Sequence, residues 1–162
     1  MTLDQYRAIT QQKCWGSYAT SLLNGEELAP EARKNFGTYW IEGGHHMREQ
    51  IADDQLLVRL LRRLLPSYDG GPMELYRGEN RNRWQNRSIG LAWTSSIETA
   101  RMFGGGLNAV QSGGVLLKAR FEPEAIISGP NAHSKYLGEG QYTIDPFSFP
   151  DLSAVESFPP IA

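Results

Sequence analysis

Pro66 separates two patterns of apolar residues in this 162-residue chain, and the contrast limits the possible folds more than any other feature. Before Pro66, apolar side chains recur at helical spacing, most clearly over 47–65. After it, short runs alternate between apolar and polar side chains, most clearly over 114–121, which is typical of strands. The sequence therefore predicts an α+β protein with a helical N-terminal region and a second half rich in strands.

Helix start and stop signals divide the first region. Thr2 is placed to cap a first helix, and Gln5 follows at the spacing of a capping box. A proline is favoured at the first position of a helix, whereas paired glycines favour its end. The expected helices span 2–23, from Pro30 to Gly43-Gly44, and 47–65.

The second half is expected to form short strands around one helix. That helix spans 97–103 with Ser96 as its N-cap, and the glycine-rich segment 104–114 is expected to be a flexible loop. The expected strands are 73–78, 89–94, 114–121, 126–127 and 142–144. We expect one compact domain overall, made of a helical region (1–66), a core (67–147) and an extended C-terminal tail on the surface (148–162).

Composition favours a globular protein of a reducing compartment. Hydrophobic residues make up 40% of the chain, yet no apolar run approaches the roughly 20 residues that span a bilayer. The first residues lack the basic start and apolar segment of a secretory signal, so we expect a cytoplasmic protein with no membrane partner. The lone Cys14 fits this compartment, and we expect it to be buried as a small apolar side chain.

Charge is distributed unevenly along the chain. Residues 67–121 contain seven basic and four acidic side chains, whereas 122–162 contain one basic and six acidic. Arg81, Arg83, Trp84 and Arg87 could hold phosphates and stack a base, which makes nucleic-acid binding one alternative. The pI of about 5.9 and the acidic C-terminal segment make a nucleic-acid partner unlikely.

Two segments could bind an anionic ligand. Arg77 ends an apolar strand and precedes Gly78, so its guanidinium could bind a phosphate while the glycine admits a ligand to the backbone. The structural alternative is an ion pair of Arg77 with Glu74 or Glu79. The second segment, 90–95, ends a strand in hydroxyls before a helix, which offers either a polar ledge for a ligand or an ordinary helix cap.

A third segment brings a carboxylate close to an amide. Glu139 and Gln141 lie two residues apart before an apolar run, and residues at that spacing on a strand share a face. We therefore expect both side chains to point toward the same space. The alternative is a polar loop that leads into the last strand.

In this order, the three segments resemble the motifs of the mono-ADP-ribosyltransferases: a strand with arginine, a strand with a Ser-Thr-Ser type motif, and a late strand with Glu/Gln-x-Glu. The runs "LYRGE", "GLAWT" and "QYTIDP" are most similar to the bacterial and phage branch, which reads roughly YRGE, GLSWT and E-Y-I-V-D-P. The resemblance covers about residues 73–147. It implies a split β-sandwich that binds NAD, as substrate, in the cleft between its sheets.

The resemblance also implies roles for individual residues. Arg77 would hold the NAD phosphates, and Gly78 would bind the nicotinamide amide through its backbone, next to Tyr76. The Ser-Thr-Ser position falls on Ala92-Trp93-Thr94, where Trp93 and Thr94 would contact the dinucleotide and Ala92 lacks the usual serine. Phe103 would lie near the nicotinamide ribose.

The catalytic glutamate of the family falls on Gln141, with Glu139 upstream of it. A carboxylate stabilises the positive charge that develops on the ribose when the bond to nicotinamide breaks, and glutamine lacks that charge. Losing one such contact typically costs on the order of 10²–10³ in rate. Gln141 is therefore an engineered change, the mark of a natural binding-only relative, or a sign that Glu139 acts in a shifted register; the first is favoured.

The implied activity is the transfer of ADP-ribose from NAD to a macromolecular acceptor, expected to be a protein of a host or target cell, in a bacterial, phage or toxin-effector setting. A glutamate at the Glu139 position points to arginine as the modified side chain. The segment 128–138 would then be the substrate loop, with Lys135 and Tyr136 as contacts. A noncatalytic NAD-binding or protein-interaction module is the alternative, and no metal is predicted, because His45 and His46 are adjacent and poorly spaced to chelate.

Overall fold

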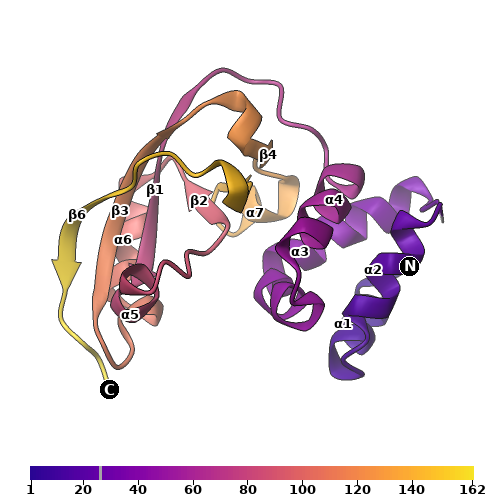
Figure 1. Cartoon of the computed structure of the whole chain (residues 1–162), viewed down its shortest axis with the longest axis horizontal. Coiled ribbons are helices and arrows are strands. Elements are labelled where there is room, and N and C mark those ends of the chain that lie inside the picture. Colours follow the sequence, from indigo (N-terminus) through magenta and orange to yellow (C-terminus); the bar gives the residue numbers. More distant parts are fainter. Residues whose placement is uncertain (26) are drawn as a thin grey trace. The chain divides into compact units, whose positions relative to one another are not determined.

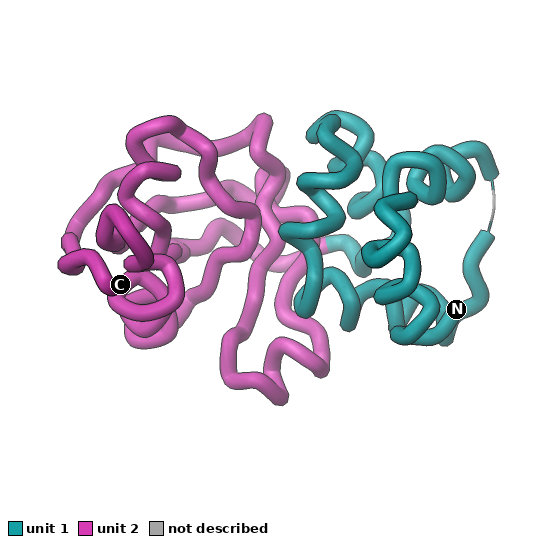
Figure 2. The backbone as a smooth tube through the Cα atoms, turned by 90° about the horizontal axis from the view of Figure 1, so that it is seen from below, with its two compact units in different colours: residues 1–67 teal, residues 68–162 magenta. Residues whose placement is uncertain are grey.

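The computed structural model describes residues 1–25 and 27–162, and this part of the chain divides into two compact units. The first unit is Met1–Ser67 and the second is Tyr68–Ala162, as Figure 2 shows in two colours. All helices of the first unit precede all strands of the second. The protein is therefore α+β, as the change of pattern at Pro66 predicts.

Helices α1 (Leu3–Gln11), α2 (Trp15–Leu23), α3 (Pro30–Ile51) and α4 (Asp54–Leu64) form the first unit (Figure 1). The predicted cap of α1 is confirmed: the Thr2 side chain accepts from the Gln5 backbone N–H, and the Gln5 side chain accepts from that of Thr2. The prediction of a single helix over 2–23 is wrong. Lys13, between α1 and α2, has a positive φ of 56°, which interrupts the helix. Pro30 begins α3 as expected.

The predicted helix end at Gly43-Gly44 is confirmed in part. Gly43 leaves the helical conformation, with φ of −133° and ψ of 18°, but the chain resumes as a helix at once, so α3 runs across this kink to Ile51 and contains His45 and His46. A Cβ at Gly43 would fall 2.6 Å from Cζ of Tyr39, so the glycine also serves close packing of an aromatic ring. The next helix, α4, is capped by Asp53, whose carboxylate accepts from two backbone N–H groups.

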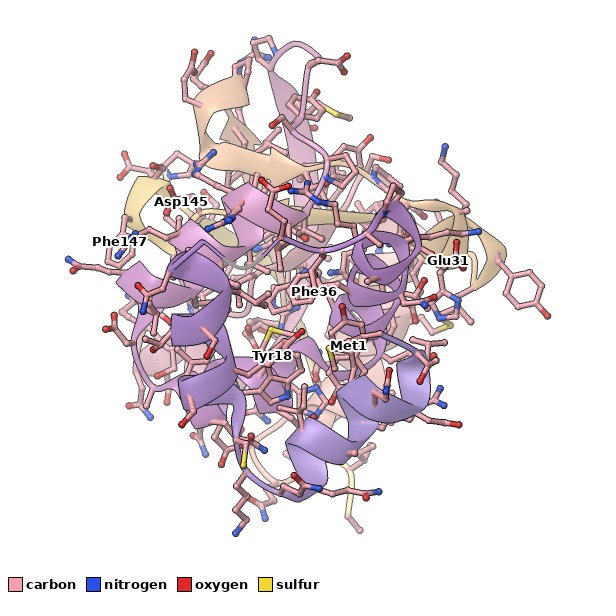
Figure 3. The ribbon with its side chains drawn as sticks, turned by 90° about the vertical axis from the view of Figure 1, so that its right-hand side faces the viewer. Met1, Tyr18, Glu31, Phe36, Asp145 and Phe147 are labelled. Carbon is pink, nitrogen blue, oxygen red and sulfur yellow. The ribbon has the colours of Figure 1, made fainter. Side chains whose placement is uncertain are left out.

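An aromatic cluster fills the first unit. Tyr6 stacks on Trp15 with ring centroids 6.1 Å apart and meets Phe36 edge to face at 5.8 Å. The Tyr6 hydroxyl donates to the Ala32 carbonyl at 2.8 Å, and burial, followed by interaction with Tyr18, raises its pKa well above the ordinary tyrosine value. Met1, Tyr18 and Phe36 lie together at this cluster in Figure 3. Cys14, expected to be buried, is exposed at the start of α2 instead.

The described strands of the second unit form one six-stranded sheet in the order β4-β5-β2-β1-β3-β6, and all its pairings are antiparallel. The prediction for 114–121 is confirmed residue for residue, and those for 73–78, 126–127 and 142–144 are confirmed with small changes of bounds. The expected tail contains a strand at the sheet edge instead. The strands are β1 (Met73–Asn80), β2 (Ala92–Thr94), β3 (Gly114–Phe121), β4 (Ile126–Ser128), β5 (Gln141–Ile144) and β6 (Ser153–Phe158).

The helices of the second unit are short, and they are α5 (Arg81–Gln85), α6 (Ile97–Gly105) and α7 (Ala132–Tyr136). Ser96 caps α6 as predicted, by accepting from the Thr99 N–H. The expected flexible loop 104–114 is wrong: it holds the last turn of α6 and the 3-10 turn η1 (Leu107–Ala109). The glycines serve close packing here too, because a Cβ on Gly78 or Gly114 would overlap backbone atoms of α6.

One face of the sheet bears the apolar core of the second unit. Trp93 meets Phe121 edge to face with ring centroids 5.0 Å apart, and Phe149, which follows β5, packs against both. The buried members of this core are Leu75, Ile89, Trp93, Val115, Leu117, Ala119, Phe121, Ala125, Ile126 and Ile144.

Strands β1 and β2 meet over a very short length at the centre of the sheet. Strand β1 pairs with β3 along all eight of its residues, whereas Tyr76 and Thr94 are the only described pair between β1 and β2. The sheet therefore consists of two halves, β4-β5-β2 and β1-β3-β6, joined at this point.

Candidate functional site

The three segments with candidate site residues include neighbouring strands, since β2 lies between β5 and β1 in the sheet. Thr94 pairs with Tyr76 of β1 on one side and with Gln141 of β5 on the other. Directly paired residues of antiparallel strands point to the same face. Tyr76, Thr94 and Gln141 therefore form a row on the face opposite the apolar core, and we call it the Tyr76–Thr94–Gln141 row.

Arg77 points to the other face, because successive residues of a strand alternate. Its Nε donates to Oε2 of Glu79 at 2.7 Å, and its Nη1 donates to the carbonyl oxygen of Ala92 at 2.8 Å. The side chain is 17% exposed. Of the two interpretations of Arg77, the ion pair with Glu79 is the one present in the structure, while Glu74 bonds Tyr76 and Lys118.

Glu79 is the best-connected carboxylate of this region, with its side chain only 1% exposed. Besides Arg77, it accepts from the backbone N–H groups of Asn80 and Gly90, each at 2.9 Å, and its Oε1 lies 3.5 Å from Nε of Arg83. Burial alone would raise the pKa of Glu79, but the charge and hydrogen bond of Arg77 and the two backbone donors hold it below its ordinary value. Glu79 is therefore ionised and structural.

The Arg77–Glu79 pair bridges the two halves of the sheet. Arg77 belongs to β1 but bonds the Ala92 carbonyl of β2, and Glu79 of β1 accepts from Gly90 just before β2. A Cβ at Gly90 would overlap the Arg77 guanidinium, so any side chain there would have to displace Arg77 from its present position. Sequence reasoning did not single out Gly90 for this role, although the "GL" that opens its motif was the available signal.

Gly78 presents backbone to the edge of β1 that β2 leaves open. The backbone N–H of Arg81 donates to the Gly113 carbonyl, in register with the β1–β3 pairing. In an antiparallel pair, the backbone groups of successive residues point alternately toward and away from the partner strand. The N–H and C=O groups of odd-numbered β1 residues therefore bond β3, whereas those of even-numbered residues, such as Gly78, point toward β2. The Gly78 carbonyl accepts from Nδ2 of Asn108 at 2.7 Å. Nothing in the sequence signalled Asn108.

The Ser-Thr-Ser position is divided between the two faces. The Thr94 hydroxyl is nearly buried in the Tyr76–Thr94–Gln141 row and accepts from the Ser96 N–H at 3.1 Å, as in a helix-entry cap. Trp93 is 1% exposed, and its indole N–H donates to the Gly90 carbonyl at 3.1 Å. Trp93 is therefore a core residue, whereas Phe103 lies half-buried on α6.

Gln141 begins β5 and is 9% exposed, but Glu139 lies ahead of the strand. Gly140 between them has φ of +54°, a left-handed conformation. The strand alternation that predicted a shared face for Glu139 and Gln141 therefore does not hold. The Glu139 N–H instead donates to the Ser134 carbonyl at 3.0 Å, which ties this turn to α7.

The expected substrate loop is in part a helix. Lys135 and Tyr136 lie on α7, whose N-cap Asn131 accepts from the Ser134 N–H. The Tyr136 side chain is 85% exposed, and Lys135 is exposed beside it. Both side chains are therefore accessible to a macromolecule.

The arginines of the nucleic-acid alternative mostly contact the protein itself. Arg81 donates to the Phe158 carbonyl at 3.3 Å, and Arg83 donates to that of Ser88 at 3.0 Å. The Arg87 guanidinium lies 3.9 Å from the centre of the Trp84 ring, which leaves one face of that ring covered. In this arrangement, the Trp84 ring does not have both of its faces free for stacking with a base.

A pocket of about 480 Å³ lies beside this group. Arg87 and Asp151 are its charged lining residues, and Ile89, Phe149, Pro150 and Leu152 complete the lining. It is on the side of the apolar core and does not include the Tyr76–Thr94–Gln141 row.

Comparison with protein-family models, with curated proteins and with solved structures finds no match in any of the three. Among the described residues, no group of three or more His, Cys, Asp or Glu side chains could hold a metal ion. No helix in the described part of the chain has the length and apolar character needed to cross a membrane.

Proposed function

We propose that this protein is an NAD-dependent mono-ADP-ribosyltransferase that modifies a protein acceptor. The observation that supports the proposal most is the position of the three motif strands, which are separate in sequence but adjacent in the sheet. Their motif residues meet in the Tyr76–Thr94–Gln141 row. A resemblance in sequence order alone does not require this adjacency.

In this proposal, NAD lies against the face that bears the row. The nicotinamide end approaches the open backbone edge at Gly78, near Phe103, while the Thr94 hydroxyl and the Gln141 amide lie on the ribose side. Arg77 lies behind the strand and is engaged with Glu79 and Ala92. We therefore assign Arg77 to holding β2 against β1, in place of the phosphate contact that the resemblance implies.

The reaction breaks the bond between ribose C1′ and the nicotinamide nitrogen, and neutral nicotinamide leaves with the bonding electrons. A nucleophilic side chain of the acceptor then bonds C1′ and loses a proton to water. Positive charge develops on the ribose in between, and an anionic group at position 141 would stabilise it. Gln141 can donate and accept hydrogen bonds but supplies no charge.

The test is a comparison of the protein with its Gln141→Glu variant, each incubated with labelled NAD and a bacterial lysate. We expect nicotinamide release and protein labelling to rise on the order of 10²–10³-fold in the variant, the usual value of one such contact. The Gln85→Glu variant makes the same isosteric change at an exposed position and is expected to leave both rates unchanged. If neither the protein nor Gln141→Glu binds or consumes NAD, the transferase proposal fails.

A noncatalytic NAD-binding or interaction module is the second candidate, and Gln141 and Ala92 favour it because both lack groups that the catalytic motif contains. Under this alternative NAD raises the melting temperature, but Gln141→Glu releases no nicotinamide. The setting that accompanies the transferase proposal is the cytoplasm of a bacterial, phage-infected or effector-target cell, with a host or target protein as acceptor. We expect arginine side chains of this acceptor protein to be modified, and we expect the acceptor to contact the exposed Lys135 and Tyr136.

A further inference from the structure

The pocket of about 480 Å³ in the second unit is lined by the turn after α5 and by the segment 149–152, and the proposed function does not use it. We propose that this pocket binds a small zwitterion with a large apolar side chain, namely a free amino acid or a dipeptide. Because the pocket does not include the Tyr76–Thr94–Gln141 row, the inference is independent of the proposed function.

The apolar lining of the pocket is continuous with the core of the second unit. Ile89 lines the pocket, is 4% exposed and belongs to that core. Phe149 lines it too, and its ring packs on Trp93 and Phe121 with centroids 6.1 and 6.4 Å away. A lining that is fixed in this way suits an apolar side chain, and the volume falls within the range of about 300–1,000 Å³ that is typical of small-molecule sites.

Two opposite charges, Arg87 and Asp151, line the same pocket. Within the described part of the chain, neither side chain forms a hydrogen bond or an ion pair with another residue. The Arg87 guanidinium lies 3.9 Å from the centre of the Trp84 ring, and this contact leaves its charge and N–H donors available to an anion. A carboxylate would pair with Arg87 and an ammonium group with Asp151. Because Asp151 would repel a polyanion, the pocket favours a ligand with one group of each sign.

Arg87 occupies a backbone position at which glycine is favoured. It follows Asn86, the C-cap of α5, and has φ of +58°, in the left-handed region. Its N–H donates to the Trp84 carbonyl at 3.1 Å, and the Ser88 N–H donates to that of Arg83 at 2.9 Å, which are the hydrogen bonds of a Schellman motif. Glycine adopts this conformation freely, whereas a side chain has a steric cost there. The turn itself does not need arginine, and the side chain serves instead to bind the carboxylate of the ligand.

This position allows the guanidinium to be removed without harm to the fold. Arg87→Gly is expected to keep or raise the melting temperature, because glycine relieves the left-handed conformation. It is expected to weaken zwitterion binding on the order of 10-fold, the usual value of a hydrogen bond to a charged group. The isosteric Asp151→Asn variant should weaken it by a similar factor through the ammonium group. The matched controls are Arg120→Gln and Asp69→Asn, which remove the same charges at other exposed positions of the second unit.

The experiment is calorimetric titration of the full chain and these variants with phenylalanine, the dipeptide leucyl-phenylalanine and three analogues. Phenethylamine lacks the carboxylate, phenylpropionate lacks the ammonium group, and N-acetylphenylalaninamide lacks both charges. We expect both zwitterions to bind more tightly than every analogue. Arg87→Gly should weaken binding of phenylpropionate but not of phenethylamine, and Asp151→Asn should do the reverse. The zwitterion that binds more tightly identifies the source of the ligand, a free amino acid or a peptide.

Three results would overturn the inference. The first is that neither zwitterion binds, and the second is that Arg87→Gly and Asp151→Asn bind both zwitterions as tightly as the unmodified protein does. The third is a lower melting temperature of Arg87→Gly together with weaker binding of every probe, which would show that this arginine serves the fold. Failure of NAD to bind in a parallel titration would overturn only the proposed function, because NAD is not a ligand of this pocket.

Discussion

At the scale of single residues, Glu79 shows how a buried charge is tolerated between two separating strands. Its carboxylate faces Arg77 and two backbone N–H groups, so each of its two buried oxygens accepts at least one hydrogen bond. The Arg77–Glu79 pair could be anticipated from the sequence, because Glu79 follows Arg77 at the spacing of strand residues that share a face. The role of Gly90 could not, because it depends on a turn that brings together two residues 11 positions apart in the chain.

Removing the Glu79 carboxylate should destabilise the second unit, and the loss should depend on pH. We expect Glu79→Ala to lower the free energy of unfolding by about 3–5 kcal/mol at pH 7, because Arg77 would be left buried without its partner. The pKa of Glu79 is lowered in the folded protein, so its contribution is present above the ordinary value of 4.5 and is lost as the pH falls below it. Urea titrations from pH 7 to pH 3 measure both effects.

The conservative Glu79→Gln variant isolates the charge. Its deficit relative to the unmodified protein is expected to shrink as the pH falls below 4.5. A Glu79→Gln deficit that is equal at pH 7 and pH 3 would contradict an ionised Glu79.

At the scale of elements, α6 packs so closely on β1 and β3 that a side chain at the points of contact would overlap the backbone. Gly78, Gly104 and Gly114 provide this approach, since a Cβ on Gly78 would overlap the Ala100 carbonyl and backbone atoms of Gly104. In the sequence, the glycines of 104–114 resemble those of a flexible loop. Composition cannot distinguish a glycine that frees the chain from one that lets another backbone approach, because the difference lies in a tertiary contact.

Gly78→Ala should therefore push α6 away from the sheet. We expect the free energy of unfolding to fall by about 1–3 kcal/mol, the usual cost of forcing extra atoms into a packed interior. Gly16→Ala is the matched control, because a Cβ there meets no atom within 4 Å and the residue lies in α2. That control is expected to stabilise the protein by about 0.5–1 kcal/mol. Chemical denaturation measures both, and a Gly78→Ala variant as stable as the unmodified protein would show that α6 shifts at no cost.

Strands were predictable where one face is buried and unpredictable where it is not. Strand β3 is buried at nearly every position and alternates between apolar and charged residues over Leu117–Phe121, so its bounds followed from the sequence. Strand β6 is mostly exposed and flanked by prolines, and exposed edge strands leave little alternation to detect. The order of the strands in the sheet, which brings Tyr76, Thr94 and Gln141 together, depends on pairings between distant segments that local patterns do not encode.

At the scale of the whole molecule, each of the two units has its own core. Tyr6, Trp15 and Phe36 fill the helical unit, whereas Trp93 and Phe121 belong to the sheet unit. The change at Pro66 marked the boundary between them to within one residue. Separate cores permit separate loss of structure, since cooperative units open with their own free energies.

Reciprocal core substitutions test this separation. We expect Trp15→Ala to destabilise the helical unit by about 3–5 kcal/mol and Phe121→Ala to do the same to the sheet unit. Hydrogen exchange followed by mass spectrometry should show lost protection in 1–67 for the first variant and in 68–162 for the second. If either substitution lowers protection equally in both ranges, the protein unfolds as one cooperative unit instead.

The join between the half-sheets also affects how readily the protein can change in evolution. Main-chain ladders, such as the one between β1 and β3, are nearly indifferent to side-chain identity and resist point mutation. Beyond Tyr76 and Thr94, the link between the halves instead consists of Arg77, Glu79 and the space left by Gly90. Single substitutions there alter how the two halves are held together while the ladders stay intact. Selection therefore needs very few mutations to change the spacing between the half-sheets.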